Sequence, residues 1–444
     1  MKTRTYFPLM DRPSESTIAF DTTGAVNATR FLEEVMLLAG RLPAQRYVIN
    51  LFSDRYRYLV GFCAATVASQ CTLMPPNRLP FTLKQLMEEY EDCYLLGEGQ
   101  PLAAPLAVAA DGAGVAPEIA ADQLCAIAFT SGSTGRPKAN LKYWRTLRDG
   151  TRSNARLLLD SSGRCLNLLA TVPPQHMWGM EMSILLPLFA PVAISYRTPF
   201  FPQDIADALA TLPEPRALVS SPVHLDTLLK SGVSLPSLSR IYTATAPLSP
   251  ALANELEERF ATVVTDVFGC SETGVLAARR PVHDTYWTAS GVFDLVNRKD
   301  GTLVRAEHLP GNVLMPDIIE AAGDYRFRWI GRHQDMINIA GKRGSLADLN
   351  QRLKAMPGVT DGVVFMPERS RRLAALVVAP GLAAADVIGY LKTHLEPVFL
   401  PRPVYLVPEL PRQETGKLAL SSVLELFTNV HAGRGQAEIT GSAP

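Results

Sequence analysis

Between residues 45 and 265 the chain alternates short β-branched runs with amphipathic helical runs, and this alternation limits its possible folds most strongly. It predicts strands at Tyr47–Phe52 and Ile241–Thr245, followed by helices at Arg55–Ser69 and Pro250–Phe260. Strands joined by helices need crossover connections, which favour parallel sheets covered by helices. The expected fold class is α/β, with a large N-terminal domain of mostly parallel sheets flanked by helices. The same pattern adds a helix at Leu83–Tyr90, a strand at Cys93–Leu96, a strand at Leu218–Ser220 and a helix at Leu225–Lys230.

The pattern changes near residue 332. Turn residues at Asp300-Gly301 and Pro310-Gly311 indicate a small β-rich region before this point. After it, the spacing predicts a compact α+β domain with a helix whose first residues, Ser345 and Asp348, are spaced as in a capping box. The expected elements are helices at Ser345–Met356 and Ala385–Leu395 and strands at Gly362–Phe365, Leu373–Val378 and Tyr405–Leu406.

These features predict a domain division. We expect an N-terminal domain over residues 1–332 and a small mobile domain over 333–430. Residues 431–444 are rich in Gly and Ala without periodicity, so we expect a disordered tail there.

Composition excludes several classes of protein. The 444 residues exceed one ordinary core, so two or three domains are expected. Lys and Arg total 43, as do Asp and Glu, and this balance gives no basic excess to bind nucleic acid or an anionic membrane. The six cysteines form no C-x-x-C pair, which argues against the usual zinc sites and a disulfide framework. No run approaches about 18 apolar residues, and the N-terminus lacks an apolar signal core, so a cytoplasmic location is expected.

One loop concentrates groups suited to a polyphosphate. A predicted strand at Ala126–Phe129 runs into Thr130-Ser-Gly-Ser-Thr-Gly-Arg-Pro-Lys138. Glycines let backbone N–H groups close around an oxyanion, hydroxyls add donors, and a lysine adds charge. The pattern is not G-x-x-x-x-G-K-[ST], because Pro137 precedes the lysine. A Ser/Gly-rich surface turn is the alternative. The proposed cofactor-binding residues here are Thr130, Ser131, Gly132, Ser133, Thr134, Gly135 and Lys138.

This segment resembles the phosphate loop of the adenylate-forming superfamily, which contains acyl- and aryl-CoA ligases, luciferases and peptide-synthetase adenylation domains. The family's usual form is Thr-Ser-Gly-Ser/Thr-Thr-Gly-x-Pro-Lys-Gly, and only the last glycine differs, being Ala139. Phe268-Gly-Cys-Ser-Glu-Thr273 then resembles the family's Tyr-Gly-x-Thr-Glu motif. The resemblance implies that Phe268 and Gly269 lie against adenine, that Ser271 supplies the hydroxyl, and that Glu272 binds Mg²⁺.

Three further positions follow in the family's order. Asp317 precedes Gly331-Arg332 by the spacing of the family's ribose-binding aspartate, and Arg343 stands at the place of a phosphate-contacting arginine. Leu410-Pro-Arg-Gln-Glu-Thr-Gly-Lys417 resembles the C-terminal element whose lysine neutralises charge on the α-phosphate and the substrate carboxylate. Taken singly, Glu272, Asp317 and Lys417 are compatible with ordinary solvated turns. Their common order is what favours the family.

The resemblance implies a two-step reaction. The acid attacks the α-phosphate of Mg²⁺·ATP, and pyrophosphate leaves. The pantetheine thiol of CoA or of an acyl carrier protein then displaces AMP to give a thioester. The small domain would turn about a hinge after Arg332, at either Gln334 or Asp335.

Two segments suggest which acid is activated. Pro173-Pro-Gln-His-Met-Trp-Gly179 lies where the family has its first acyl-pocket motif. It carries His176 where amino-acid activators have an aspartate, and Trp178 offers a flat wall. A core or surface histidine is the alternative for His176. The run Thr243-Ala-Thr-Ala-Pro-Leu248 resembles the family's Ser-Gly-Gly-Ala-Pro element, and Thr245 would fill the space that a glycine leaves for a long chain. A short or aromatic acid is therefore expected, in a pocket formed by His176, Trp178, Thr243, Thr245, Ala246 and Pro247.

Two short segments resemble the sequences of AMP ligases from aryl-polyene and xanthomonadin-type pigment pathways. They are Arg328-Trp-Ile-Gly-Arg-His and Arg372-Leu-Ala-Ala-Leu-Val-Val-Ala-Pro380. This likeness implies a hydroxybenzoate loaded onto an acyl carrier protein. An aryl- or acyl-CoA ligase using free CoA is the nearest rival. A non-catalytic nucleotide-binding module and an ATPase or kinase are rivals of other classes.

Overall fold

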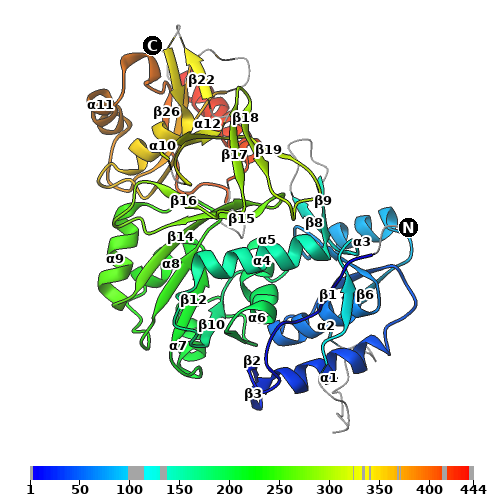
Figure 1. Ribbon diagram of the computed structural model, residues 1–444. Helices are drawn as coiled ribbons and strands as arrows, with labels where there is room; N and C mark the ends of the chain where they lie inside the picture. Colours follow the sequence, from blue (N-terminus) through cyan, green and yellow to red (C-terminus); the bar gives the residue numbers. More distant parts are fainter. Residues whose placement is uncertain are drawn as a thin grey trace. The chain divides into compact units, whose positions relative to one another are not determined.

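The computed structural model divides the chain into two compact units, Met1–Asp294 with Val304–Val313, and Leu295–Leu303 with Leu314–Pro444 (Figure 1). The predicted domain boundary at residue 332 falls within the second unit and stays a prediction. For residues 336, 338, 342–344 and 433–439 only the backbone is described. The structure describes residues 4–98, 115–130, 138–323, 325–332, 336–339, 342–367, 370, 372–412 and 418–439.

The first unit contains a five-stranded sheet in which the phosphate loop connects the last two strands, β8 and β9. Its strands lie in the order β6-β4-β5-β8-β9, and all neighbours are parallel except β8 and β9, which pair antiparallel. The strands are β4 (Tyr47–Asn50), β5 (Cys71–Met74), β6 (Cys93–Leu96), β8 (Leu124–Thr130) and β9 (Lys138–Tyr143). A separate antiparallel pair joins β1 (Tyr6–Pro8) to β7 (Glu118–Ala120).

A second sheet fills the rest of this unit, in the order β16-β15-β14-β13-β12-β10-β11-β2-β3. Its centre, from β14 to β2, is parallel, and its two ends are antiparallel hairpins. The strands are β2 (Thr17–Asp21), β3 (Gly24–Asn27), β10 (Leu166–Ala170), β11 (Val192–Ser195), β12 (Arg216–Ser220), β13 (Arg240–Thr243), β14 (Val263–Cys270), β15 (Gly274–Arg279) and β16 (Trp287–Ala289).

Alternating side chains bury both faces of this sheet. In β10, Leu168 and Ala170 belong to one hydrophobic cluster and Leu169 to another. The cluster around Leu169 contains helices α7, α8 and α9, while the other contains α4 and α6, on the opposite face (Figure 1). Such two-sided cover is what the strand–helix alternation predicts. The helices are α4 (Trp144–Leu158), α6 (Leu186–Phe189), α7 (Pro202–Ala210), α8 (Pro222–Lys230) and α9 (Pro250–Phe260).

Helix α2 (Arg55–Val67) is buried almost all round, as an apolar helix inside a core must be. Asp54 caps its N-terminus by accepting a hydrogen bond from the Arg57 N–H. Its buried side chains join the main cluster together with residues of both sheets, including Met74 of β5 and Ile194 of β11. The remaining helices of this unit are α1 (Ala28–Ala39), α3 (Pro80–Glu89), α5 (Met177–Met180) and the π-helical segment η2 (Glu181–Leu185).

The second unit packs a small sheet, β24-β25-β26, between helices. In β25, Ala375 and Val377 join a cluster with α10 and α11, whereas Ala374 and Leu376 join a cluster with α12. Its elements are β20 (Asp317–Ala321), β21 (Arg326–Arg332), β22 (Met336–Ile339), β23 (Lys342–Ser345), α10 (Leu346–Lys354), β24 (Asp361–Phe365), β25 (Ala374–Val378), α11 (Ala384–His394), the 3₁₀ turn η4 (Pro397–Phe399), β26 (Val404–Leu406) and α12 (Leu420–Ile439). A further sheet has the order β17 (Asp294–Arg298), β18 (Gly301–Arg305) and β19 (Val313–Met315).

One local prediction was wrong. The Ser345 side chain makes no capping hydrogen bond, because Ser345 ends strand β23 and its Oγ faces Gly331, where an added Cβ would lie 2.6 Å away. Asp348 instead pairs with Arg352 one turn later, at 2.9 Å. Helix α12 runs as far as Ile439; the disordered tail expected over residues 431–444 stays a prediction, and residues 440–444 lie outside the described residues.

No helix in the described part of the chain is long and apolar enough to span a bilayer.

Candidate functional site

Glu272 occupies the turn between β14 and β15, and Lys138 is the first residue of β9 on the other sheet. The Lys138 Nζ lies 3.0 Å from the Glu272 Oε1. Burial alone would raise the pKa of Glu272, but the hydrogen bond and charge of Lys138 outweigh it, so this pKa lies below its ordinary value. Glu272 is therefore a carboxylate at neutral pH, held against the lysine of the predicted phosphate loop.

The phosphate loop connects two antiparallel strands. Thr130 ends β8 and lies opposite Lys138, so the ends of the loop are fixed in register. The loop residues Ser131, Gly132, Ser133, Thr134 and Gly135 lie outside the described residues, and their roles stay predictions.

The hairpin that carries Glu272 also carries Phe268, Gly269 and Ser271. Phe268 is half-buried and its ring centroid lies 5.3 Å from that of Trp287. The register shifts between Phe268 and Gly269, and a Cβ on Gly269 would lie 2.2 Å from the Gly274 carbonyl oxygen. Only glycine fits this bulge. The roles of Phe268, Gly269 and Ser271 beside adenine stay predictions.

Two buried ionisable residues beneath this turn were not found from the sequence. Lys142 of β9 donates from Nζ to the Glu272 carbonyl oxygen at 3.2 Å, and Glu181 accepts from the Val275 N–H at 2.9 Å. Burial lowers the pKa of Lys142, although the nearby Glu181 charge raises it in part. Burial likewise raises the pKa of Glu181. The available signal was the spacing of Lys138 and Lys142, which puts both on one face of a strand.

His176 stands immediately before helix α5. Its N–H donates to the Pro173 carbonyl oxygen at 3.2 Å, which closes the turn that carries it. A Cβ on Gly179 would lie 2.0 Å from that same carbonyl oxygen, so the turn requires glycine there. Beside it, Trp178 is buried, and its Nε1 has no hydrogen-bond partner among the described groups.

A buried arginine supports the strand end that leads to this turn. The Arg55 guanidinium donates to the carbonyl oxygens of Ala170 and Val172, at 2.9 and 2.8 Å, and to the Ser183 Oγ at 2.5 Å. Burial lowers the pKa of Arg55 to about 9. The arginine thus joins β10 to the π-helical segment that follows His176. Sequence reasoning missed it, because a helix-start arginine usually faces solvent.

Thr243 ends strand β13 and is fully buried, and its Oγ1 has no hydrogen-bond partner among the described groups. Thr245, two residues later, has φ +81°, a left-handed conformation that β-branched residues rarely adopt. Its side chain is exposed, as is Pro247, and Ala246 is half-buried. These residues follow the carboxyl end of a parallel strand, where open α/β sheets bind ligands.

The second unit contains the predicted ribose-binding residue. Asp317 is buried at the start of β20, where its Oδ1 accepts from the Trp329 Nε1 at 2.9 Å and lies 3.4 Å from the Arg332 Nε. The Thr302 hydroxyl donates to its backbone carbonyl oxygen at 2.7 Å. Asp317 and Arg332 are opposite residues of one hairpin, so the structure brings these two predicted residues together.

Lys417 and residues 413–416 lie outside the described residues, but the base of their loop is well defined. Arg412 and Leu418 form an isolated antiparallel bridge. Both Arg412 contacts to the Asp361 carboxylate are 2.7 Å, and the Lys354 Nζ lies 3.4 Å from it. Arg343 pairs with Asn338 through the backbone in β22 and β23, and its side chain is not described.

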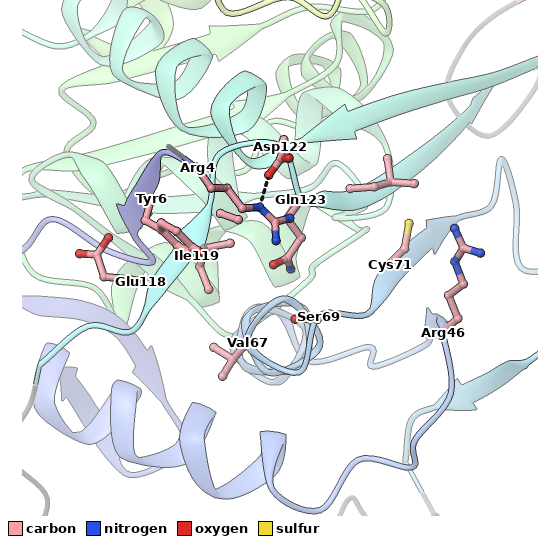
Figure 2. Close-up of a pocket in the computed structure, with 12 residues that line it drawn as sticks. Arg4, Tyr6, Arg46, Val67, Ser69, Cys71, Glu118, Ile119, Asp122 and Gln123 are labelled. Atoms are coloured by element: carbon pink, nitrogen blue, oxygen red, sulfur yellow. Dashed lines mark hydrogen bonds and ion pairs between the residues drawn. The ribbon is translucent and has the colours of Figure 1, made fainter. Parts of the chain in front are cut away.

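One cavity of the first unit lies apart from these residues. It has a volume of about 490 Å³ and is lined by Arg4, Asp122 and Leu124, among others (Figure 2). The Arg4 Nε contacts the Asp122 Oδ1 at 2.8 Å across its wall. Leu124 begins β8 and Thr130 ends it, roughly 20 Å apart along an extended strand. The cavity therefore lies at the end of β8 away from the phosphate loop.

Comparison with known proteins identifies the class. Residues 62–294 match the AMP-binding enzyme family, and residues 348–417 match the AMP-binding enzyme C-terminal domain. A 4-coumarate–CoA ligase of Rhodobacter capsulatus is 29% identical over 276 residues, covering 61% of this chain and 67% of that protein. A 3,4-dihydroxybenzoate–[aryl-carrier protein] ligase of Bacillus anthracis is 21% identical over 316 residues, covering 67% and 73%.

Solved structures show the same fold. ATP-bound MatB of Rhodopseudomonas palustris aligns with a TM-score of 0.79 at 17% identity, covering 95% of this chain and 98% of that one. The o-succinylbenzoate–CoA synthetase MenE of Bacillus subtilis, in complex with ATP and magnesium ion, aligns with a TM-score of 0.78 at 16% identity, covering 93% and 98%.

The chain therefore belongs to the AMP-binding enzyme family, since the family match covers more than half of it. It is an AMP-forming acid–thiol ligase, as the sequence predicted.

Proposed function

We propose that this ligase activates an aryl acid, such as a hydroxybenzoate, as its adenylate and transfers the acyl group to the pantetheine thiol of an acyl carrier protein. The 3.0 Å contact between Lys138 and Glu272 is the observation that supports the proposed nucleotide site. It joins the predicted phosphate loop to the predicted magnesium residue although these lie on different sheets.

Glu272 suits a hard cation. Its lowered pKa keeps a carboxylate available, and Mg²⁺ in nucleotide enzymes binds through one or two carboxylates together with phosphate oxygens. Bound Mg²⁺ would neutralise charge on the phosphates. Lys138 is 64% exposed in its side chain, so it is free to turn from Glu272 towards a phosphate.

The resemblance to the family assigns nucleotide roles to Asp317, Arg343 and Lys417 as well. Asp317 accepts the ribose hydroxyls, with Trp329 and Arg332 fixing the orientation of its carboxylate. Arg343 contacts a phosphate, and Lys417 neutralises the charge that develops on the α-phosphate and the acid. Catalysis of nucleotidyl transfer by such positioned charges needs no covalent enzyme intermediate.

The proposed acyl pocket combines an aromatic wall with unsatisfied donors. His176 and Trp178 lie at the turn after β10, and Thr243 lies at the end of β13. The Trp178 Nε1 and the Thr243 Oγ1 are buried without partners in the described structure, and a buried donor without an acceptor costs about 1–3 kcal/mol. A ring hydroxyl of the acid can satisfy such a donor, whereas an aliphatic chain cannot.

The strained backbone of Thr245 supports a functional role at the same edge. Left-handed residues other than glycine persist where the surroundings demand them, often at ligand sites. In this proposal the Thr245 side chain, with Ala246 and Pro247, shortens the pocket. A substrate series of hydroxybenzoates, cinnamates and fatty acids tests it. Hydroxybenzoates should support the fastest pyrophosphate release, and better activity with palmitate would contradict the aryl assignment.

The acceptor is the second part of the proposal. The resemblance to carrier-protein ligases favours an acyl carrier protein, and the similar protein from Bacillus anthracis bears an aryl-carrier protein in its name. Arg372 is exposed at the start of the segment that resembles pigment-pathway ligases, and it offers charge to an acidic carrier; Arg369 and Arg371 lie outside the described residues. The rival, a ligase using free CoA, is favoured by the similarity to 4-coumarate–CoA ligase.

The second half-reaction separates these acceptors. The purified chain should be given aryl-adenylate with either holo-acyl carrier protein or CoA at equal thiol concentration. We expect thioester on the carrier protein at the higher kcat/KM. Faster transfer to CoA would establish the rival instead.

A further inference from the structure

We propose that Lys142 and Glu181 are positioning residues that hold the Glu272 turn, residues 271–273, in the geometry that binds Mg²⁺. The inference rests on the proposed function, because it assumes the magnesium role of Glu272. Neither residue belongs to the motifs that identified the family, and neither faces solvent.

The Lys142 side chain holds the turn through a hydrogen bond to the backbone of Glu272. Its side chain is almost fully buried, and its Nζ lies 3.2 Å from the Glu272 carbonyl oxygen. Lys138 is four residues earlier on the same strand face and contacts the Glu272 side chain at 3.0 Å. One strand therefore presents two ammonium groups to one glutamate, the exposed one to its carboxylate and the buried one to its carbonyl oxygen.

Glu181 holds the other end of the turn. Its Oε1 accepts from the Val275 N–H at 2.9 Å and from the Asn154 Nδ2 at 3.0 Å. Gly274 has φ +75°, and a Cβ there would lie 2.5 Å from the same oxygen. The turn therefore ends at Gly274, a residue in the left-handed conformation that packs directly against the buried Glu181 carboxylate. Glu181 also begins the π-helical segment, a rare geometry that is frequent at functional sites.

The energetics argue for a role beyond folding. Removing an ammonium and a carboxylate from water is costly, and apolar residues of similar volume often serve stability equally well or better. Both charged groups here hydrogen-bond to the backbone of this hairpin, Lys142 at the Glu272 carbonyl oxygen and Glu181 at the Val275 N–H. What this arrangement specifies is the position of the turn, and so the direction in which the Glu272 carboxylate points.

Magnesium dependence tests the inference. Acid-dependent ATP–pyrophosphate exchange should be measured against Mg²⁺ concentration for Lys142→Met, Glu181→Leu and Glu181→Gln, with thermal unfolding recorded for each. We expect the first two substitutions to raise the half-saturating Mg²⁺ concentration by about 10-fold or more, as losses of outer-sphere support do. Glu181→Gln keeps an oxygen acceptor for Val275 and should stay within about twofold of the parent chain.

The matched control is Asp266→Asn, which breaks a buried ion pair at the far end of the same hairpin, 3.0 Å from Arg279. It should lower the unfolding temperature without changing the Mg²⁺ dependence. An unchanged Mg²⁺ dependence in Lys142→Met, or an equal change in Asp266→Asn, would overturn the positioning role. Asn154→Leu removes only the donor to Glu181 and applies the same test should Lys142→Met not fold.

Glu272→Gln separates a failure of the proposed magnesium role of Glu272 from a failure of the positioning role of Lys142 and Glu181. If this substitution leaves the Mg²⁺ dependence unchanged, the magnesium role in the proposed function has failed. If it raises the half-saturating concentration while Lys142→Met and Glu181→Leu do not, only the positioning role has failed.

Discussion

Lys138 and Glu272 are 134 positions apart in the sequence and form an ion pair of 3.0 Å. Lys138 belongs to the sheet that ends at the phosphate loop, whereas Glu272 belongs to the turn of a hairpin in the other sheet. The pair places an ammonium group and a carboxylate where these two sheets meet. A polyphosphate with its cation needs both kinds of charge at one point.

Glu272→Gln should reduce adenylate formation. The substitution keeps the shape and removes the charge, so the cation loses its protein carboxylate and Lys138 loses its partner. We expect kcat/KM for pyrophosphate exchange to fall by about 100-fold, in the range found when one preorganised electrostatic contact is removed. Glu255→Gln on exposed α9 is the control and should leave exchange unchanged. Activity of Glu272→Gln near the parent level would remove Glu272 from the site.

Lys417→Ala should abolish adenylate formation while the chain stays folded. The lysine lies outside the described residues, so its role rests on the family motif alone. Circular dichroism and thermal unfolding of the variant should match the parent chain, and exchange should fall by at least about 100-fold. Thioester formation from added aryl-adenylate should be largely retained, because the lysine acts in the first half-reaction. Undiminished exchange would refute the assignment.

Asp361→Asn should destabilise the base of the Lys417 loop in a pH-dependent way. Burial alone would raise the pKa of Asp361, but Arg412 and Lys354 outweigh it, so the folded pKa lies below the ordinary value. The stabilisation is therefore present above the unfolded pKa and is lost as the pH falls through the folded one.

At pH 7 we expect Asp361→Asn to lower the free energy of unfolding by about 1 kcal/mol, allowing for partial solvent screening. At pH 3, below the ordinary aspartate pKa of about 3.9, the difference from the parent chain should be smaller than at pH 7. Urea unfolding at both pH values measures it. Asp348→Asn, which breaks the exposed pair with Arg352, is the matched control and should cost only a few tenths of a kcal/mol. An equal loss for both variants would contradict the anchoring role of Asp361.

Gly179→Ala should disturb the turn that carries His176. The added Cβ would lie 2.0 Å from the Pro173 carbonyl oxygen, so the backbone must move. We expect a loss of about 1–3 kcal/mol in unfolding free energy and a raised KM for the acid. Gly311→Ala meets no atom within 4 Å and should change neither. An unaltered KM for the acid in Gly179→Ala would show that this turn does not help to form the acyl pocket.

The alternation of strands and helices predicted the fold class. Two strands joined through a helix need a crossover connection, and such a connection makes the strands parallel. Strand β6 and helix α9 have the bounds predicted for them. Ser345 shows the limit of such reasoning: a capping box requires a free N-cap side chain, and here the preceding strand and Gly331 direct it elsewhere.

The site was predictable where a motif is contiguous and less so where distant segments meet. Phe268, Gly269, Ser271 and Glu272 share one hairpin, and sequence order alone keeps them together. Lys142 and Glu181 approach the same turn from a strand and a π-helical segment that no local pattern connects. Arg55 is similar, since its partners at Ala170 and Val172 are more than a hundred positions away.

Acid-dependent exchange of labelled pyrophosphate into ATP tests the central claim most directly. The full chain with Mg²⁺ and a hydroxybenzoate should incorporate label, lose this activity without the acid, and release AMP once a thiol acceptor is added. Release of ADP and phosphate, or no exchange with any aryl, cinnamic or fatty acid, would contradict the account.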